Sequence, residues 1–289
     1  MSDTMTVTLK APYRFIKVLQ SNEEARTVRL LAENRRSGGF VSIKAISLKH
    51  DAQLELRCVQ DAAVLQRIYS PHLAATYEYW SQDDAFWLAQ EYVHGKDLEE
   101  YLAGIRPKDR VLRSVRIFKD IAHAVDVLHM AGLVLGRITP GDIIVDPMGM
   151  PKLLYHSLAP GEKSSTRMLR RVAYQATMAS VAPESFNGGQ AGIQADVYAF
   201  GALMYNAVCG SQHVIASRYD DAIQAIRERT PDAPSTLEPG VPAALDAIIL
   251  DALARDAGRR THSMRELAKQ LAELLDSQPK GSAAGSPRN

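Results

Sequence analysis

Two charged residues stand in apolar stretches where their charge needs a partner. Lys44 lies within the strand-like run Phe40–Leu48. Its amine either meets an acid inside the protein or reaches water from a sheet edge along its aliphatic stem. Asp61 falls on the apolar face of a helix predicted over Asp51–Ser70, where its carboxylate either meets a cation or marks the solvent edge of that face. We therefore predict that Lys44 and Asp61 form an ion pair or come near to one.

The elements around this pair are mainly strands. Apolar residues alternate or cluster at strand length in Arg14–Leu19, Thr27–Ala32, Phe40–Leu48, Ala74–Trp80 and Ala85–Ala89. From Lys96 onward the periodicity is mainly helical, with one apolar helix opening at Asp196 and a capping box of Ser263 and Glu266 before a last helix. The order predicts an α+β protein of two lobes, in which five antiparallel strands and one helix precede a helical lobe.

Composition narrows the class of protein. Lysine and arginine total 34 and aspartate and glutamate total 33, so a net charge of +1 gives no reason to expect nucleic acid as a partner. The most apolar stretch, Val197–Cys209, is shorter than a membrane span and contains polar residues, which indicates a buried helix. Two cysteines and a start without an apolar run lead us to expect a cytoplasmic protein.

Several local motifs occur in the order typical of one family. The chain resembles the protein kinase superfamily, in particular the bacterial eukaryotic-like serine/threonine kinases. The residues that carry the resemblance are Val41–Lys44 (VSIK), Glu91–Gly95 (EYVHG), Gly132–Val145 (GLVLGRITPGDIIV), Lys152–Ala159 (KLLYHSLA), Ala182–Glu184 (APE), Asp196–Gly201 (DVYAFG) and Arg260. They cover roughly Tyr13 to Leu275, which implies a bilobal kinase fold.

The resemblance assigns domains. It implies an N-terminal extension over 1–12, a kinase-like domain over 13–276 and a disordered tail over 277–289. Within the domain the small lobe covers 13–90, the hinge 91–95 and the large lobe 96–276.

The resemblance also assigns two groups of residues. Five positions correspond to a vestigial nucleotide site: Lys44, Asp61, Glu91, Val93 and Ile144. A structural group comprises Glu184 and Arg260, expected to form the buried ion pair of the large lobe, and Asp196, expected to hold the catalytic-loop backbone or else to cap its helix.

The positions that carry kinase chemistry depart from the family pattern. Gln20–Thr27, in place of the glycine-rich loop, contains no glycine and carries Glu23 and Glu24, which would repel phosphates. Arg137 stands at the position of the catalytic base, although a guanidinium has no acceptor for a proton. Tyr155 replaces the aspartate of the D-F-G motif, and a neutral phenol is a poor ligand for Mg²⁺. Asp142, at the position of the metal-binding asparagine, still offers a carboxylate.

These departures predict a catalytically inactive kinase-fold protein, a pseudokinase that acts as a scaffold or allosteric regulator. We expect ATP binding to be weak or absent, no Mg²⁺ and no other metal. We expect a protein partner, either an active kinase or a component of an assembly, and no membrane span. The alternatives are a nucleotide sensor without turnover, which Lys44 favours, and a residual or atypical ATP-dependent serine/threonine kinase, which Asp142 favours.

One loop offers a regulatory site. Ser164, Ser165 and Thr166 lie among basic residues after Tyr155, where kinases are switched by phosphorylation. The plainer interpretation is a solvated loop of ordinary composition.

Overall fold

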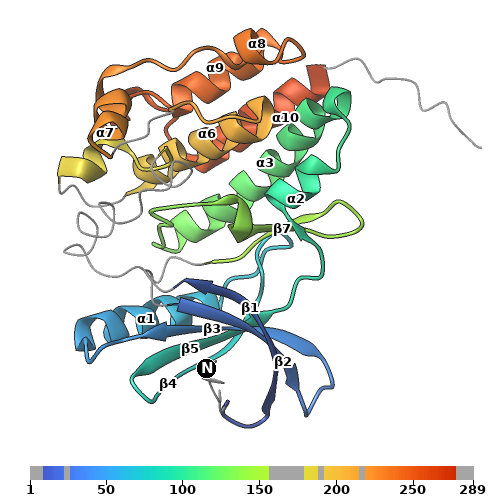
Figure 1. Cartoon of the computed structure of the whole chain (residues 1–289), viewed down its shortest axis with the longest axis vertical. Helices are drawn as coiled ribbons and strands as arrows, with labels where there is room; N and C mark the ends of the chain where they lie inside the picture. The colour runs from blue at the N-terminus through green and yellow to red at the C-terminus, as the bar shows by residue number, and fades with distance from the viewer. Residues whose placement is uncertain (1–8, 23–26, 156–178, 188–191, 215–218, 278–289) are drawn as a thin grey trace, which may run out of the picture.

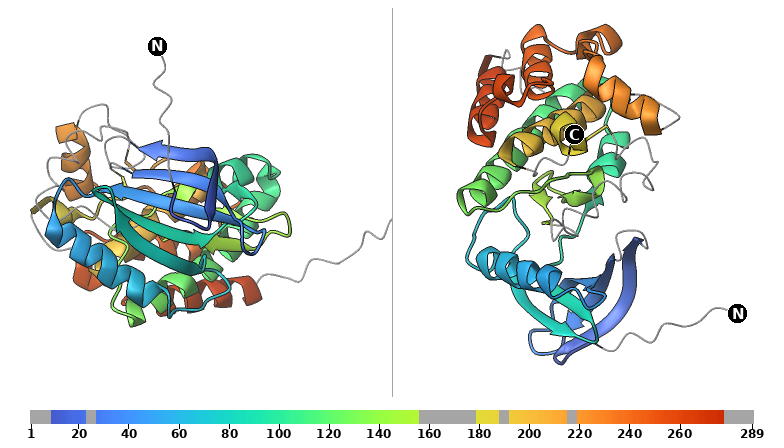
Figure 2. Two further views of the ribbon diagram at one scale, coloured as in Figure 1. Left: turned by 90° about the horizontal axis from the view of Figure 1, so that it is seen from below. Right: turned by 90° about the vertical axis from the view of Figure 1, so that its left-hand side faces the viewer.

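The computed structural model describes residues 9–22, 27–155, 179–187, 192–214 and 219–277, and it consists of two lobes (Figure 1). The smaller lobe contains one sheet and one helix. The larger lobe contains most of the helices and lies on the other side of a short connection near strand β7. The views of Figure 2 show the same division from two further sides. The predicted α+β bilobal architecture is therefore confirmed.

The small lobe is built on a five-stranded antiparallel sheet with the order β1-β2-β3-β5-β4. Its strands are β1 (Tyr13–Asn22), β2 (Thr27–Asn34), β3 (Phe40–Ser47), β4 (Thr76–Gln82) and β5 (Ala85–Glu91). The central strand β3 is buried over six of its eight residues, because both of its faces are covered. It pairs with β2 on one side and β5 on the other, which fixes which way Lys44 points.

Helix α1 (Ala52–Leu65) crosses one face of this sheet. Asp51 caps its N-terminus by accepting a hydrogen bond from the backbone of Leu54, at 2.9 Å. The predicted helix extended to Ser70, which is wrong by five residues. After Leu65 the α-helix gives way to turns in which a backbone N–H donates to the carbonyl three residues earlier, as from Ile68 N to Leu65 O.

The large lobe packs its helices around α6 (Ile193–Cys209), which is buried along nearly its whole length. The helix begins three residues before Asp196, so the predicted opening at Asp196 is corrected. The other described helices are α2 (Leu98–Ala103), α3 (Pro107–Met130), α7 (Tyr219–Glu228), α8 (Pro234–Leu237), α9 (Ala243–Ala252) and α10 (Met264–Ser277). Short 3₁₀ turns cover Pro140–Asp142, Pro183–Asn187 and Ala257–Arg259. The α10 helix continues to Ser277, the first residue of the predicted tail.

A second, three-stranded sheet lies where the lobes meet. It consists of β6 (Lys96–Asp97), β7 (Ile143–Val145) and β8 (Pro151–Leu153). The segment after α1 joins it through backbone bonds from Leu153 N to His72 O, at 2.8 Å, and from Ala74 N to Leu153 O, at 2.9 Å. The small lobe is thus tied to the large lobe here as well as through the hinge. Among the described residues, we find no helix long and apolar enough to cross a bilayer.

Candidate functional site

Lys44 lies inside the protein, on the central strand β3. Only 6% of the residue is exposed, and its direct neighbour across the strands is Arg29 of β2. Burial, together with the Arg29 charge, lowers the pKa of Lys44 to about 7, while Asp142 and Cys58 oppose the shift. The interpretation of Lys44 as an exposed sheet-edge residue is therefore wrong.

Asp61 makes its contacts elsewhere. Burial raises the pKa of Asp61 to about 6, whereas Arg57 and a hydrogen bond from Tyr155 favour its charged form. The electrostatic neighbours of Lys44 and of Asp61 are thus different groups. An ion pair between Lys44 and Asp61 stays a prediction.

Tyr155 lies two residues after the end of β8, and only 1% of the residue is exposed. Its ring packs in the main hydrophobic core. Its hydroxyl donates a hydrogen bond to the backbone oxygen of Val134, at 3.5 Å. The side chain at the D-F-G aspartate position is therefore directed at the protein interior.

Asp142 is held in place by Thr139, three residues earlier in the chain. Its Oδ2 accepts hydrogen bonds from the backbone N–H of Thr139, at 2.7 Å, and from the Thr139 hydroxyl, at 2.8 Å. Burial raises the pKa of Asp142, and the Arg137 charge, both Thr139 hydrogen bonds and Arg29 all oppose that shift. The charges of Arg137 and Arg29 thus both favour the ionised form of this carboxylate.

Arg29 is a site residue that the sequence interpretation missed. Burial lowers the pKa of Arg29 to about 10, while the Asp142 charge opposes the shift. One signal was available, because Arg29 interrupts an otherwise apolar strand. A single cation within a strand is common, however, and its neighbour Lys44 became apparent only with the register of β2 and β3.

The hinge carries the remaining predicted nucleotide positions. Glu91 reaches from the end of β5 to Lys152 of β8, with 2.6 Å between Oε1 and Nζ, and its Oε2 accepts from Ala75 N at 3.2 Å. Val93 lies in the hinge and Ile144 in β7, both partly exposed. The hinge ends at Gly95, where an added Cβ would stand 2.2 Å from the Val145 oxygen, so only glycine fits without a shift.

Asp196 holds the backbone of the catalytic-loop region. Its Oδ2 accepts from Leu135 N at 2.7 Å, its Oδ1 accepts from Gly136 N at 2.6 Å, and His129 Nε2 lies 2.7 Å from Oδ2. The expected anchoring role is confirmed. The alternative of a helix cap is wrong, because Gly192 occupies the N-cap of α6.

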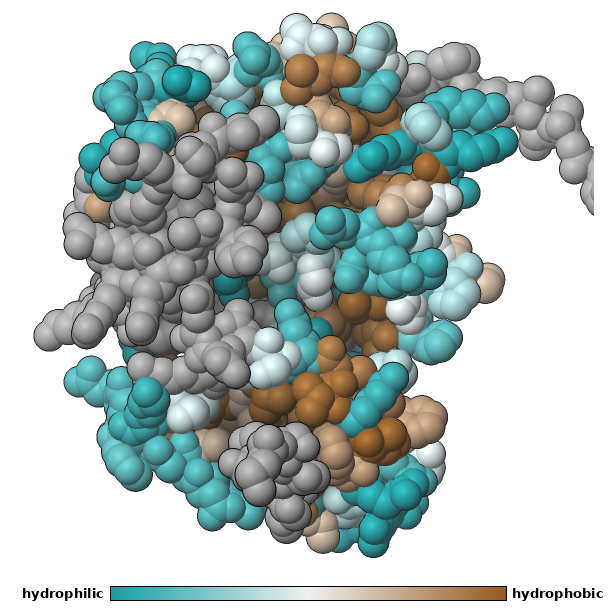
Figure 3. Space-filling view, in the orientation of Figure 1, coloured by the Kyte–Doolittle hydropathy of each residue, from teal (hydrophilic) through white to brown (hydrophobic). Residues whose placement is uncertain are grey.

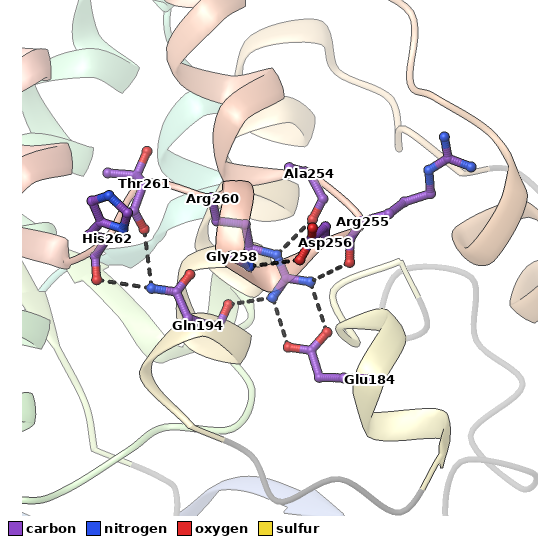
Figure 4. Close-up of polar contacts among 9 residues, drawn as sticks. All are labelled: Glu184, Gln194, Ala254, Arg255, Asp256, Gly258, Arg260, Thr261 and His262. Carbon is purple, nitrogen blue, oxygen red and sulfur yellow. Dashed lines mark hydrogen bonds and ion pairs between the residues drawn. The ribbon is translucent and has the colours of Figure 1, made fainter.

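Glu184 and Arg260 form the ion pair predicted for the large lobe (Figure 4). Both terminal nitrogens of Arg260 donate to Glu184 oxygens at 2.8 Å, and the arginine also donates to the backbone oxygens of Gln194, Ala254 and Arg255. Its side chain is fully buried and stacks on Tyr198, 5.1 Å from the ring centre. Glu184 belongs to the turn Pro183–Asn187 and Arg260 follows the turn Ala257–Arg259, so the ion pair joins two separate segments of the lobe.

Three groups of predicted residues lie outside the described residues. They are the loop glutamates Glu23 and Glu24, His156 with Ser157 of the D-F-G segment, and the hydroxyl cluster Ser164, Ser165 and Thr166. The regulatory interpretation of that cluster stays a prediction.

The surface of the small lobe is unusually apolar along β1. Figure 3 shows hydrophobic residues gathered on this lobe beside the hollow between the two lobes. The large apolar side chains exposed on β1 are Phe15 (37%), Ile16 (38%), Val18 (51%) and Leu19 (37%). Among the described strands, β1 pairs only with β2, so its outer edge faces no other described strand.

Comparison with solved structures matches this arrangement to kinase domains. The crystal structure of the PknI kinase domain of Mycobacterium tuberculosis aligns with a TM-score of 0.69. The alignment covers 94% of this chain and 99% of that chain, at 22% identity. This likeness concerns the fold.

Sequence comparison leads to bacterial kinases. A probable serine/threonine-protein kinase of Streptomyces coelicolor is 28% identical over 88% of this chain and 38% of its own length. The serine/threonine-protein kinase PrkC of Bacillus subtilis is 26% identical over 91% of this chain and 40% of its own length. The chain thus spans about two fifths of the length of these relatives. A family model described as the protein kinase domain matches residues 26–275, and the chain therefore belongs to the protein kinase family.

Proposed function

We propose that this chain is a catalytically inactive member of the family that acts by binding another protein. The observation that carries the proposal is the position of Tyr155. The residue at the position where kinases place a magnesium ligand has a buried aromatic ring, and its hydroxyl donates to the backbone oxygen of Val134. A phenol in that position stabilises the fold and offers no carboxylate to a metal.

The neighbouring residues do not fit Mg–ATP either. Phosphoryl transfer requires metal ions that neutralise the phosphates and a base that orients the substrate hydroxyl. Arg137 has no acceptor, so it cannot act as that base. Asp142 keeps a carboxylate, but one Oδ is engaged by both hydrogen bonds from Thr139. We therefore derive no catalytic step through a magnesium–nucleotide complex.

The surface supports a protein partner. The apolar side chains of β1 are exposed together on one edge strand, as in surfaces that bind other proteins. Strand addition and apolar side-chain contacts are both available there. A partner bound at this edge would contact the small lobe while leaving the helical lobe open.

A second candidate is a serine/threonine protein kinase activity. The names of the bacterial relatives favour it. It requires that Asp142 and Lys44 support phosphoryl transfer without the usual base or D-F-G aspartate.

Phosphotransfer with radiolabelled ATP and generic protein acceptors separates the two candidates. The wild-type chain should incorporate no more label than the Lys44→Ala variant, with Mg²⁺ and with Mn²⁺. Robust incorporation that Lys44→Ala abolishes would establish the kinase and refute the inactive member.

The binding half of the proposal has its own test. Val18→Lys places a charge on the exposed edge strand, and Leu237→Lys makes the same change at a residue of the large lobe that is 53% exposed. Proteins crosslinked to the wild-type chain in its native cell should be lost with Val18→Lys and retained with Leu237→Lys. Equal retention by both variants would exclude β1 as the partner surface.

A further inference from the structure

The large lobe has an exposed apolar surface of its own, where the turn between β7 and β8 meets helix α3. Met148 and Met150 of this turn are 87% and 45% exposed, and Leu112 of α3 is 39% exposed. Figure 1 shows the turn projecting from β7 on the side of the lobe that carries α2. Large apolar side chains that stay exposed together mark surfaces that bind other molecules.

The turn that presents these methionines is held by its own hydrogen bonds. Asp146 Oδ1 accepts from the backbone N–H groups of Met148 and Met150, both at 2.8 Å. The Asp146 N–H donates to the Met150 backbone oxygen at 3.0 Å, and the Gly149 N–H donates to the Asp146 backbone oxygen at 2.9 Å. Met148 therefore projects from an ordered backbone, which reduces the conformational entropy that a partner has to overcome on binding.

Contacts at two points place this turn along α3. A Cβ added to Gly149 would stand 3.8 Å from a terminal nitrogen of Arg113 in α3. Two residues later, His72 Nδ1 donates to the Pro151 backbone oxygen at 3.0 Å, and His72 Nε2 lies 3.9 Å from Asp120 of α3. The chain thus follows α3 from Arg113 toward Asp120, so the turn and the helix form one continuous surface.

Two arginines give this surface a positive charge. Arg113 and Arg116 are both exposed, and neither has an ion pair or hydrogen bond with another described residue. Asp109 and Asp120 lie one helical turn away, but each forms an ion pair with a different basic residue, at 2.7 and 3.1 Å. Within the described part of the chain, the two guanidinium groups therefore stand beside exposed apolar side chains without a counter-charge.

We infer that this surface docks a segment of a partner protein that carries aspartate or glutamate on both sides of a large apolar side chain. Its residues, named the α3–turn surface, are Leu112, Arg113, Arg116, Met148 and Met150. Carboxylates match the planar fork of a guanidinium. Methionine side chains are unbranched and flexible, so they adapt to the shape of an apolar partner residue. The inference goes beyond the proposed contact at β1 and holds whether or not the chain transfers phosphate.

Fluorescence anisotropy with the full chain and a labelled peptide tests this docking. The peptide is Gly-Asp-Glu-Leu-Leu-Asp-Glu-Gly. One matched peptide replaces its acids by asparagine and glutamine, and another replaces its leucines by serine. The wild-type chain should bind the acidic peptide, and each matched peptide should bind about tenfold more weakly, because each lacks one of the two kinds of contact.

Variants of the chain locate the binding. Arg116→Glu should weaken binding of the acidic peptide about tenfold, since it introduces a like charge. Arg67→Glu makes the same change at an exposed arginine of the small lobe and should bind like the wild type. Met148→Ser should weaken binding about threefold, whereas Met130→Ser, at a 72% exposed methionine at the other end of α3, should not. All four changes affect exposed side chains, so each variant should unfold at the wild-type temperature.

The inference is overturned if the wild-type chain does not bind the acidic peptide, if the neutral peptide binds equally well, or if Arg116→Glu and Arg67→Glu bind alike. Sedimentation that shows a dimer which Met148→Ser dissociates would also overturn it, because the surface would then join two copies of this chain. Displacement of the peptide by a short oligonucleotide more readily than by unlabelled peptide would assign the surface to nucleic acid instead. Val18→Lys should bind the peptide like the wild type, so a failure at β1 and a failure here are distinguishable.

Discussion

The large lobe and the cleft treat the residues of the family pattern in opposite ways. In the large lobe, Glu184, Arg260 and Asp196 keep both their identities and their contacts, with hydrogen bonds of 2.6–2.8 Å between charged groups and their main partners. In the cleft, the motif order places Arg137 and Tyr155 at the positions of the catalytic base and the D-F-G aspartate, and Tyr155 is buried in the main core.

The difference follows from what each group does for stability. Removing one partner of a buried ion pair leaves an uncompensated charge, which costs about 3–5 kcal/mol. A catalytic base contributes to a reaction and little to the folded state, so its replacement is tolerated if the substitute packs. Under the proposed function, the large-lobe contacts are therefore ones that folding needs, whereas the catalytic positions of the cleft are not.

The largest expected effect concerns Arg260. Arg260→Ala removes five hydrogen bonds and leaves Glu184 without its partner. We expect a loss of about 3–5 kcal/mol in the free energy of unfolding, measured by urea denaturation. Arg259→Ala, at the exposed neighbouring residue, should change it by less than about 0.5 kcal/mol. Similar losses for both variants would contradict the contrast between the two regions.

A smaller loss is expected for Asp196→Asn. The amide offers a single oxygen where two backbone N–H groups and His129 now meet two carboxylate oxygens. Hydrogen bonds to charged groups contribute about 1.5–3 kcal/mol, so we expect a loss of about 2–3 kcal/mol in urea denaturation. Asp251→Asn, on an exposed face of α9, provides the control. An unchanged midpoint for Asp196→Asn would remove Asp196 from the anchoring role.

In the cleft, replacing a charged residue should raise the free energy of unfolding and not lower it. Burial raises the pKa of Asp61 to about 6, above its usual value, so the ionised form is unfavourable in the folded protein. Asp61→Asn removes this charge and should raise the free energy of unfolding at pH 7 by about 1 kcal/mol, allowing for partial exposure.

The stabilisation that Asp61→Asn provides should become smaller as the pH is lowered. As pH drops from 6 toward 4, folded wild type takes up a proton at Asp61 and loses its penalty, so the two proteins converge. Urea denaturation at pH 7 and at pH 4.5 measures this. A destabilised Asp61→Asn at pH 7 would instead support the predicted ion pair with Lys44.

Sequence motifs predicted the fold and the Glu184–Arg260 ion pair, because the order and spacing of the motifs left few alternative arrangements. Glu184 and Arg260 have one geometry in this fold, and their spacing was sufficient. The burial of Tyr155 was not predictable in the same way, because it depends on the direction of its side chain and on how the lobes pack. Arg29 was missed since its role arises from the strand register that places it beside Lys44.

The measurement that tests the central claim most directly is thermal unfolding with ATP alone, with Mg²⁺ alone and with both. The claim is that the cleft keeps the kinase fold without a site for magnesium–nucleotide. A ligand at 100 times its Kd stabilises a protein by about 2.7 kcal/mol, which raises Tm by several degrees. The account predicts no rise in Tm with Mg–ATP beyond that with ATP alone. A rise that requires ATP and Mg²⁺ together would contradict it.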